Sequence, residues 1–419
     1  MREKILIFIS DKKPWFYLVD NVFMGVILAI IAFLVNGGIL PLRDYLPEFL
    51  FTGTDLAETI LSVLAGAWLS VTTFTFSITM VVLTTYSSHY SPRIVENFLQ
   101  NKTTMRVLGT FIGGFIYNIS MLFFLNKSFV SDQVISSTVG ILYAFWCIIQ
   151  FVIFIFSVSN AIQAQNLIAG LYDEAEGSID DYLQKERSKR TDEVEVGDGD
   201  GGHEMIASTS GHLAAVNREE ILNILGDGQY KLVVEKRTGD FIHKGDVLAV
   251  LYGRGLTEEE EKELADFFPL EKKRYTVLDY RYGIQKLVDI VVRALSPGIN
   301  DPNTAISAIH SLGMLTGSLS KIDGNYDVIS EKLYVKNYPF SEDIFSIYSQ
   351  IVTYAQEDLN VMIALMRALE GAAAVSSEGN LKYLDKMHRY VYEIAMEQLS
   401  HPVDRAIMGQ RRGNGLNAG

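Results

Sequence analysis

The chain has 419 residues, of which 48% are hydrophobic and 21% are charged, and its formal net charge is −14. Residues 1–169 contain nine basic and nine acidic side chains, so the whole negative excess belongs to residues 170–419. A region this acidic repels phosphate backbones, which argues against nucleic acid as a partner, and it also repels anionic lipid surfaces.

Four long stretches of the N-terminal part carry no charged side chain. They comprise 22 residues between Asp20 and Arg43, 34 between Glu58 and Arg93, 20 between Arg106 and Lys127, and 40 between Asp132 and Asp173. A helix needs about 20 apolar residues to cross the hydrocarbon core, where its backbone groups must bond within the segment. We therefore predict four transmembrane helices, at Phe16–Leu40, Leu56–Thr85, Met105–Leu125 and Val134–Ser157.

Basic residues are concentrated on alternate sides of these spans. Four precede the first span, three lie between the second and third, and four follow the fourth, whereas the other two loops have one each. Basic residues favour the cytoplasmic side. The pattern predicts a multi-pass protein of the bacterial plasma membrane with both termini in the cytoplasm. We expect the fourth span to continue as one helix into an amphipathic stalk.

The second span is rich in hydroxyl groups. On a helix, one stripe at steps of three and four residues contains Gly66, Ser70, Thr73, Ser77, Thr84 and Ser88. Ser70, Thr73, Ser77 and Thr84 are candidate pore-lining residues, because hydroxyls replace part of an ion's hydration shell. The alternative is close helix packing through small side chains. Both interpretations remain open from the sequence.

Two carboxylates, Asp55 and Glu58, begin the same helix. A helix N-terminus stabilises acidic side chains without any further role. If several copies surround an axis, the same carboxylates form an outer mouth that attracts cations.

The third span contains Gly109 and Gly113 in a GxxxG pattern, which predicts a tight helix crossing. No ionisable side chain other than the thiol of Cys147 and the phenols of tyrosines lies deep in any span. Proton-driven carriers usually need a buried charged group, so the sequence favours a channel, a facilitator or a non-transporting anchor.

Three runs of sequence carry a resemblance to a known family, at Tyr90–Gly113, Tyr282–Ile290 and Arg293–Pro302. They resemble a family of bacterial predicted membrane proteins, domain of unknown function 2254. The resemblance extends over nearly the whole chain and implies the same architecture. It brings no activity and no catalytic residues.

After an acidic, Gly-rich linker, the pattern changes to strands, at Lys231–Glu235 and Val247–Leu251. With Gly–Asp turns between them, this part resembles half of a biotinyl/lipoyl-type barrel-sandwich. No lysine lies between Gly211 and Tyr230, where the modified hairpin would be, so we expect a structural or docking module rather than a carrier.

The later sequence has helical periodicity. Thr257 begins a capping box, and Arg281–Leu295 is amphipathic. The candidate motif Ser296, Pro297, Asn300 and Asp301 follows, and Asp301 is predicted to cap a helix with Pro302 in its first turn. The motif is either an interhelical corner or an exposed surface for a ligand or partner.

The sequence thus predicts an α-helical membrane domain with four transmembrane helices, followed by a cytoplasmic α+β region. The expected parts are the transmembrane domain at 1–160, a stalk and acidic linker at 161–204, the β module at 205–255, a helical domain at 256–408 and a disordered tail at 409–419.

No phosphate-binding, metalloprotease or nucleophile-elbow motif is present, so we expect no enzyme activity, cofactor or metal. The leading hypothesis is a homo-oligomeric channel-like protein that conducts small ions, with cations slightly favoured. The alternative is a non-conducting membrane scaffold or sensor whose cytoplasmic region recruits protein partners.

Overall fold

The computed structural model describes residues 2–94, 102–125, 132–185, 190–194, 202–226, 230–253, 257–276, 278–321 and 323–411. The chain divides into two compact units. The membrane unit comprises residues 8–88 and 92–163, and the extramembrane unit comprises residues 1–7, 89–91 and 164–419. Residues 195–201 of the predicted acidic linker and residues 412–419 of the predicted tail lie outside the described residues. The expectation of an unstructured linker up to residue 204 is wrong at its two ends, where β3 (Arg190–Thr191) and β4 (His203–Ile206) are strands.

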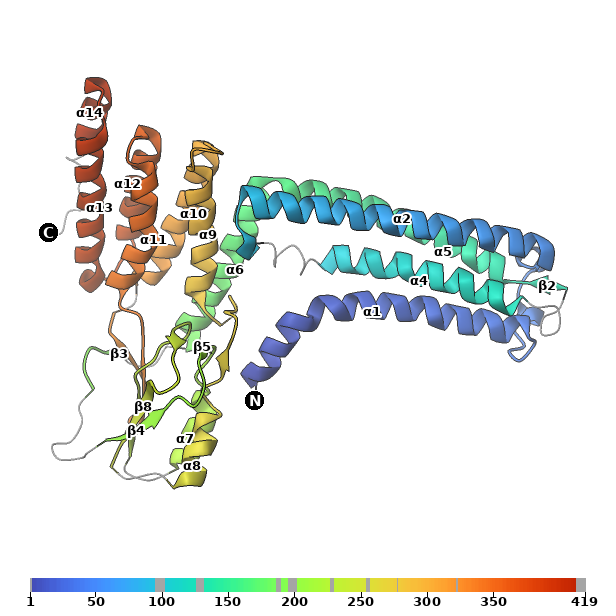
Figure 1. Cartoon of the computed structure of the whole chain (residues 1–419), viewed down its shortest axis with the longest axis horizontal. Helices are drawn as coiled ribbons and strands as arrows, with labels where there is room; N and C mark the ends of the chain where they lie inside the picture. Colours follow the sequence, from blue (N-terminus) through green and yellow to red (C-terminus); the bar gives the residue numbers. More distant parts are fainter. Residues whose placement is uncertain are drawn as a thin grey trace. The chain divides into compact units, whose positions relative to one another are not determined.

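The membrane unit is built from four long helices that run alongside one another (Figure 1). They are α1 (Arg2–Asn36), α2 (Thr54–His89), α4 (Lys102–Phe124) and α5 (Ser136–Ile162). Each contains a stretch that is long and apolar enough to cross a membrane, which confirms the four predicted spans. The connection from α1 to α2 holds two short 3-10 helices, η1 (Arg43–Tyr45) and η2 (Glu48–Leu50), and β1 (Thr52–Gly53), which pairs with β2 (Gln133–Val134).

Polar groups inside the membrane unit bond to the backbone of neighbouring helices. The Tyr143 hydroxyl donates to the Thr110 carbonyl at 2.8 Å, and the Tyr117 hydroxyl donates to the Ser136 carbonyl at 2.7 Å. The side-chain oxygen of Asn36 accepts from the Ile135 amide at 2.9 Å. Such bonds satisfy polar groups where lipid offers no partner.

The predicted continuous helix from the fourth span into the stalk is wrong. Helix α5 ends at Ile162, Gln163 is extended (φ −74°, ψ 122°), and a separate helix α6 (Ala164–Lys185) follows. The Gln163 amide donates to the Asn160 carbonyl at 3.3 Å. This bond satisfies one of the carbonyls that a helix end leaves open, so the chain stops α5 without proline or glycine.

The extramembrane unit contains most of the shorter helices. After α6 they are α7 (Arg218–Leu225), α8 (Glu258–Ala265), α9 (Tyr280–Ala294), α10 (Pro302–Leu319), α11 (Phe340–Ala355), α12 (Leu359–Ala373), α13 (Glu378–Gln398) and α14 (Pro402–Gly409). Figure 1 shows α6 and α9 to α13 packed side by side. The predicted capping box at Thr257 is confirmed, since its hydroxyl accepts from the Glu260 amide and the Glu260 carboxylate accepts from the Thr257 amide.

The β-strands of this unit form two sheets. One is six-stranded, in the order β3 (Arg190–Thr191), β10 (Tyr326–Ser330), β11 (Leu333–Lys336), β6 (Lys231–Val234), β8 (Val247–Tyr252) and β4 (His203–Ile206). Its β6–β11 pair is parallel and its other pairs are antiparallel. The second sheet has the order β7 (Phe241–Ile242), β5 (Gly211–Leu213) and β9 (Leu270–Glu271).

The strands at 231–234 and 247–252 confirm the predicted change to β structure. The barrel-sandwich topology is not confirmed, because helix α7 occupies the place of the expected hairpin and the larger sheet takes strands from residues 326–336. Strands β10 and β11 form a hairpin, and Leu333 and Val335 of β11 share a buried core with Leu232 and Val234 of β6. The expected helical domain at 256–408 is therefore wrong at β9 (Leu270–Glu271) and at 326–336. At 326–336 burial against distant strands outweighs helical periodicity.

Candidate functional sites

The hydroxyl stripe of α2 lies on an exposed face of the single chain. Ser70, Thr73, Ser77 and Thr84 are all exposed, and each hydroxyl donates to the carbonyl four residues earlier, at 2.9–3.1 Å. These bonds keep the hydroxyls tolerable in an apolar environment. Each hydroxyl oxygen retains the capacity to accept a further hydrogen bond.

The opposite face of α2 makes the contacts inside the membrane unit. Its buried residues are Ala57, Leu61, Ala65, Trp68, Thr75, Val82 and Tyr86. On the stripe itself, a side chain added at Gly66 would meet no atom within 4 Å. Packing among the described residues therefore does not use the hydroxyl stripe.

Asp55 and Glu58, the candidate outer-mouth residues, are both exposed in the first turns of α2. On a helical wheel, Asp55 falls in line with the hydroxyl stripe, whereas Glu58 lies to one side of it. The stripe therefore begins with a carboxylate at this end of the helix.

Gly109 and Gly113 lie where α4 crosses α1. A methyl group at Gly113 would lie 2.8 Å from the Asn21 carbonyl oxygen, and one at Gly109 would collide with the Leu18 carbonyl. A methyl group at Gly25 of α1 would in turn collide with the backbone of Gly113. Backbones this close leave no room for a side chain, which is the geometry that small residues permit in membrane helix pairs.

The Ser296–Asp301 motif forms the corner between α9 and α10. The Ser296 hydroxyl donates to the Arg293 carbonyl at 2.6 Å, and Asn300 has a positive φ of 51°. The Asp301 carboxylate accepts from the amide (3.1 Å) and hydroxyl (2.6 Å) of Thr304, so it caps α10 as predicted. Pro297 is exposed at the tip. Three of the four motif residues thus have a conformational role in the turn.

This corner also meets the residues that follow α2. The Ser91 hydroxyl donates to the Asp289 carboxylate at 3.0 Å. Burial, followed by the nearby Asp301 carboxylate, raises the pKa of the Tyr90 phenol. Residues from all three sequence runs that carry the family resemblance therefore lie together, a proximity that the sequence analysis missed. The only hint of this proximity in the sequence was that the runs all resemble the same family.

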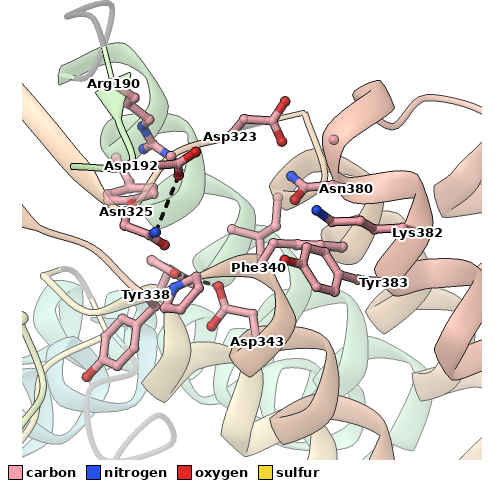
Figure 2. Close-up of a pocket in the computed structure, with 16 residues that line it drawn as sticks. Arg190, Asp192, Asp323, Asn325, Tyr338, Phe340, Asp343, Asn380, Lys382 and Tyr383 are labelled. Carbon is pink, nitrogen blue, oxygen red and sulfur yellow. Dashed lines mark hydrogen bonds between the residues drawn. The ribbon is translucent and has the colours of Figure 1, made fainter.

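A polar cavity in the extramembrane unit was also missed. It is open to solvent on one side and has a volume of about 290 Å³. Its walls come from α6, β3, α9, the end of α10, the segments before β10 and α11, and the first turns of α11 and α13 (Figure 2). Charged side chains at its walls are Arg190, Asp192, Asp323, Asp343 and Lys382. These residues come from distant parts of the chain, so no local pattern marks them as a group.

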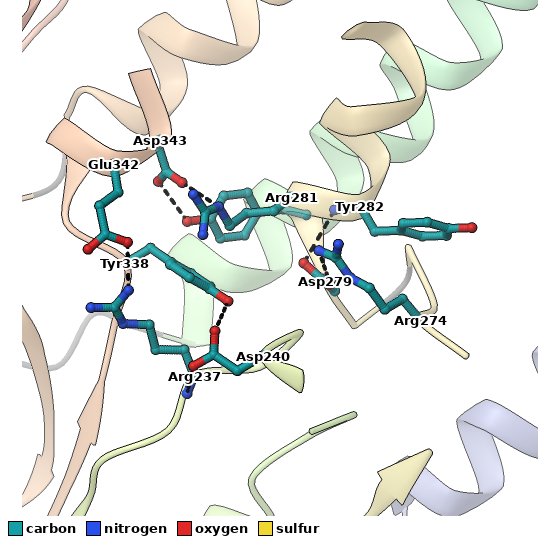
Figure 3. A network of polar contacts seen from close by, with 10 residues as sticks. Arg237, Asp240, Arg274, Asp279, Arg281, Tyr282, Tyr338, Glu342 and Asp343 are labelled. Carbon is teal, nitrogen blue, oxygen red and sulfur yellow. Dashed lines mark hydrogen bonds and ion pairs between the residues drawn. The ribbon is translucent and has the colours of Figure 1, made fainter. Parts of the chain in front are cut away.

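An ionic network lies next to this cavity (Figure 3). The Tyr338 ring lies between the guanidinium groups of Arg281, at 3.7 Å, and Arg237, at 4.8 Å. Arg281 donates to the buried Asp343 carboxylate at 2.8 Å, and the Tyr280 hydroxyl donates to it at 2.9 Å. These contacts join the β-rich part to α9 and α11 through stacked, charge-assisted bonds.

Burial raises the pKa of the Asp343 carboxyl to about 6, against the opposing effects of the Arg281 charge and the Tyr280 hydrogen bond. Folding therefore favours the protonated form, and the ionised form is penalised. The contribution of the Asp343 carboxyl to the free energy of unfolding is therefore fully present below about pH 4, and it is lost as the pH rises through about 6. A shift of this size corresponds to about 3 kcal/mol of unfolding free energy.

The Asp343→Asn variant is expected to remove this pH dependence while keeping the shape of the side chain. Denaturant unfolding of the full chain in detergent, followed by circular dichroism at pH values on both sides of 6, measures the difference from wild type. Asp385→Asn, at an exposed pair with Arg389, serves as the control. If the unfolding free energy of Asp343→Asn changes with pH as steeply as that of wild type, this carboxyl does not titrate in that range.

Comparison with known proteins places the chain in a family. The family model described as "Predicted membrane protein (DUF2254)" matches residues 11–371. Uncharacterized proteins of Mycobacterium bovis and Mycobacterium tuberculosis are 25% identical over 346 residues, which is 78% of this chain and 66% of their own length. No solved structure matches the chain. Since the family model covers most of the sequence, including all four spans, the chain belongs to the family "Predicted membrane protein".

Proposed function

We propose that the protein is an oligomeric, channel-like protein of the bacterial plasma membrane, with both termini in the cytoplasm and no enzyme activity. In this proposal, α2 helices from several copies surround a path for small ions. Ser70, Thr73, Ser77 and Thr84 line the path, and their hydroxyl oxygens replace part of the ion's hydration shell.

One observation supports the proposal above the others: the hydroxyls of the stripe are exposed and are not used by packing among the described residues. The stripe runs from Gly66 to Ser77, is interrupted by the exposed Met80 and Val81, and resumes at Thr84. A polar stripe gains nothing from facing lipid tails. Assembly of several copies gives the same stripe either a watery path or a helix partner. Apolar side chains on the flanks of the stripe, such as Leu69 and Phe76, are exposed as well and are available for contacts between copies.

The expected preference is for cations. Asp55 lies in line with the stripe and Glu58 beside it, so an assembly around an axis surrounds its outer mouth with carboxylates. A ring of negative charge raises the local concentration of cations.

Ion flux into liposomes that contain the purified protein tests conduction. Thr73→Val and Ser77→Ala each remove a hydroxyl from the stripe, and a barrier raised by about 1.4 kcal/mol slows flux about tenfold. The matched control is Thr72→Val, because the Thr72 hydroxyl donates to the Trp68 carbonyl at 2.7 Å from the side of the helix away from the stripe.

Flux that falls in both stripe variants and not in Thr72→Val supports a path along α2. Wild-type liposomes without flux would contradict conduction. Flux that is equal in wild type and in all three variants would contradict a path along the hydroxyl stripe of α2. A monomer in detergent, measured by light scattering, would also contradict an assembled path.

The alternative is a non-conducting membrane scaffold or sensor. The polar cavity beside α6 favours it, because a ligand there contacts the helix that follows the fourth span. This alternative predicts no flux and a cytoplasmic protein partner whose capture requires the extramembrane unit.

A further inference from the structure

The polar cavity of the extramembrane unit is too small for a macromolecule and suits a compact ligand. Its volume of about 290 Å³ lies at the lower end of the range for small-molecule pockets. Aromatic side chains provide much of the remaining wall, with Tyr182, Tyr280, Tyr338, Phe340 and Tyr383 among the lining residues. Tyrosine faces attract an ammonium group, and tyrosine hydroxyls offer hydrogen bonds to a polar ligand.

Negative charge is available on one part of the wall. Asp192 accepts a hydrogen bond from the Asn325 side chain at 3.3 Å, and Asp323 accepts one from the Ser377 hydroxyl at 2.8 Å. Among the described residues, neither carboxylate has a cation within ion-pair distance. An ionised carboxylate accepts about four hydrogen bonds, so each retains most of its capacity.

Positive charge comes from a different element. Lys382 lies on the first turns of α13, beside Asn380 in Figure 2. Its ammonium group lies 4.9 Å from the centre of the Tyr383 ring and has no carboxylate partner in the described part of the chain. Arg190, the second cation of the wall, already pairs with the buried Asp327 at 3.1 Å. Lys382 is therefore the cation available to a ligand.

The charges of Asp192, Asp323 and Lys382 determine which kinds of ligand fit the cavity. A phosphate-rich ligand suits this cavity poorly, because one available lysine faces two carboxylates. The described residues contain no cluster of three His, Cys, Asp or Glu side chains that would hold a metal ion. Asp192, Asp323 and Lys382 are exposed side chains at the open side of the cavity. Charges of both signs, without an ion-pair partner among the described residues, match a molecule that carries both charges itself.

We propose that this cavity binds a small zwitterion, with the ligand carboxylate at Lys382 and the ligand ammonium at Asp192 and Asp323. The ligand has the size and charge of an amino acid. Tyr182 at the wall belongs to α6, which begins two residues after α5 ends. A bound ligand would therefore contact the helix that follows the fourth span in the sequence. The proposal does not depend on conduction.

Isothermal titration of the full-length protein in detergent tests the proposal. Glycine, β-alanine, γ-aminobutyrate and ε-aminocaproate carry both charges at increasing separation and therefore measure the spacing of the site. Butyrate and butylammonium each carry one charge on a matched skeleton. The best zwitterion is expected to bind at least about tenfold more tightly than either, since each added charge contact contributes about 1.4 kcal/mol or more.

Two variants locate the charges. Lys382→Met is expected to remove the advantage of the zwitterion over butylammonium and to leave butylammonium binding unchanged. Asp323→Asn is expected to remove the higher affinity of the zwitterion relative to butyrate, while the amide oxygen of the new asparagine still accepts the Ser377 hydrogen bond. Lys386→Met changes an exposed lysine one turn further along α13 that does not line the cavity, and it should bind as wild type does.

Absence of binding by all four zwitterions up to about 10 mM, a range that covers weak millimolar sites, would overturn the proposal. Equal affinity for zwitterions and singly charged probes would also overturn it. So would a Lys382→Met protein that binds the zwitterion as tightly as Lys386→Met does. Each result is independent of whether liposomes show flux.

Discussion

Replacing Asp327 with alanine is expected to disrupt the edge of the six-stranded sheet and to cost about 3–5 kcal/mol of unfolding free energy. The Asp327 side chain is fully buried and accepts from Arg190 of β3 and Arg218 of α7, each at 3.1 Å. The Asn337 side chain also donates to it. Removal of the fully buried carboxylate takes the shared counter-charge from two guanidinium groups whose side chains are only 11% and 24% exposed. This loss is far more costly than the loss of a surface ion pair.

Hydrogen exchange of the full-length protein measures this effect locally. Peptides that cover β10 and β11 should lose protection in Asp327→Ala. The control is Asp385→Ala, which breaks the exposed Asp385–Arg389 pair of α13 and should cost less than about 1 kcal/mol. Equal exchange in the two variants would show that the buried pair contributes no more than an exposed one.

The second large effect is expected in the membrane unit, where Gly113→Ala should destabilise the protein and Gly66→Ala should not. A methyl group at Gly113 would lie 2.8 Å from the Asn21 carbonyl oxygen and 2.9 Å from the Tyr143 hydroxyl. Relief requires α1 and α4 to separate along their crossing, since one of these neighbours is backbone. Overpacking of this kind typically costs about 1–3 kcal/mol.

Gly66→Ala is the matched control because it makes the same change in another transmembrane helix with nothing within 4 Å of the new methyl group. In a helix, alanine is favoured over glycine by up to about 1 kcal/mol, so this variant should be as stable as wild type or more so. Thermal unfolding in detergent, followed by the loss of the monodisperse peak in size-exclusion chromatography, compares the two. If Gly113→Ala unfolds at the same temperature as Gly66→Ala, the result would contradict the tight α1–α4 crossing.

Some local features of the extramembrane unit were predictable because neighbouring residues decide them. The capping box at Thr257 and Glu260 and the cap that Asp301 provides for Thr304 follow from side chains that bond to amides three residues away. Such signals act within one helical turn, so their outcome changes little with the surrounding fold.

Other features escaped the sequence because they join distant parts of the chain. The break at Gln163 has no proline or glycine to mark it. The hairpin at 326–336 became β structure because Leu333 and Val335 share a buried core with strands about a hundred residues earlier. The cavity residues Tyr182 and Lys382 meet only when α6 and α13 pack into the same unit.

What the sequence by itself determined is the membrane character of the protein: four stretches without charge require hydrocarbon around them, and four helices of sufficient length occupy those stretches. The tertiary structure alone decided which face of α2 is used for packing and which charges surround a cavity. The physical reason is range. Hydropathy and capping depend on residues within a few turns, whereas burial, charge pairing and cavity shape depend on contacts that arise only when distant segments fold together.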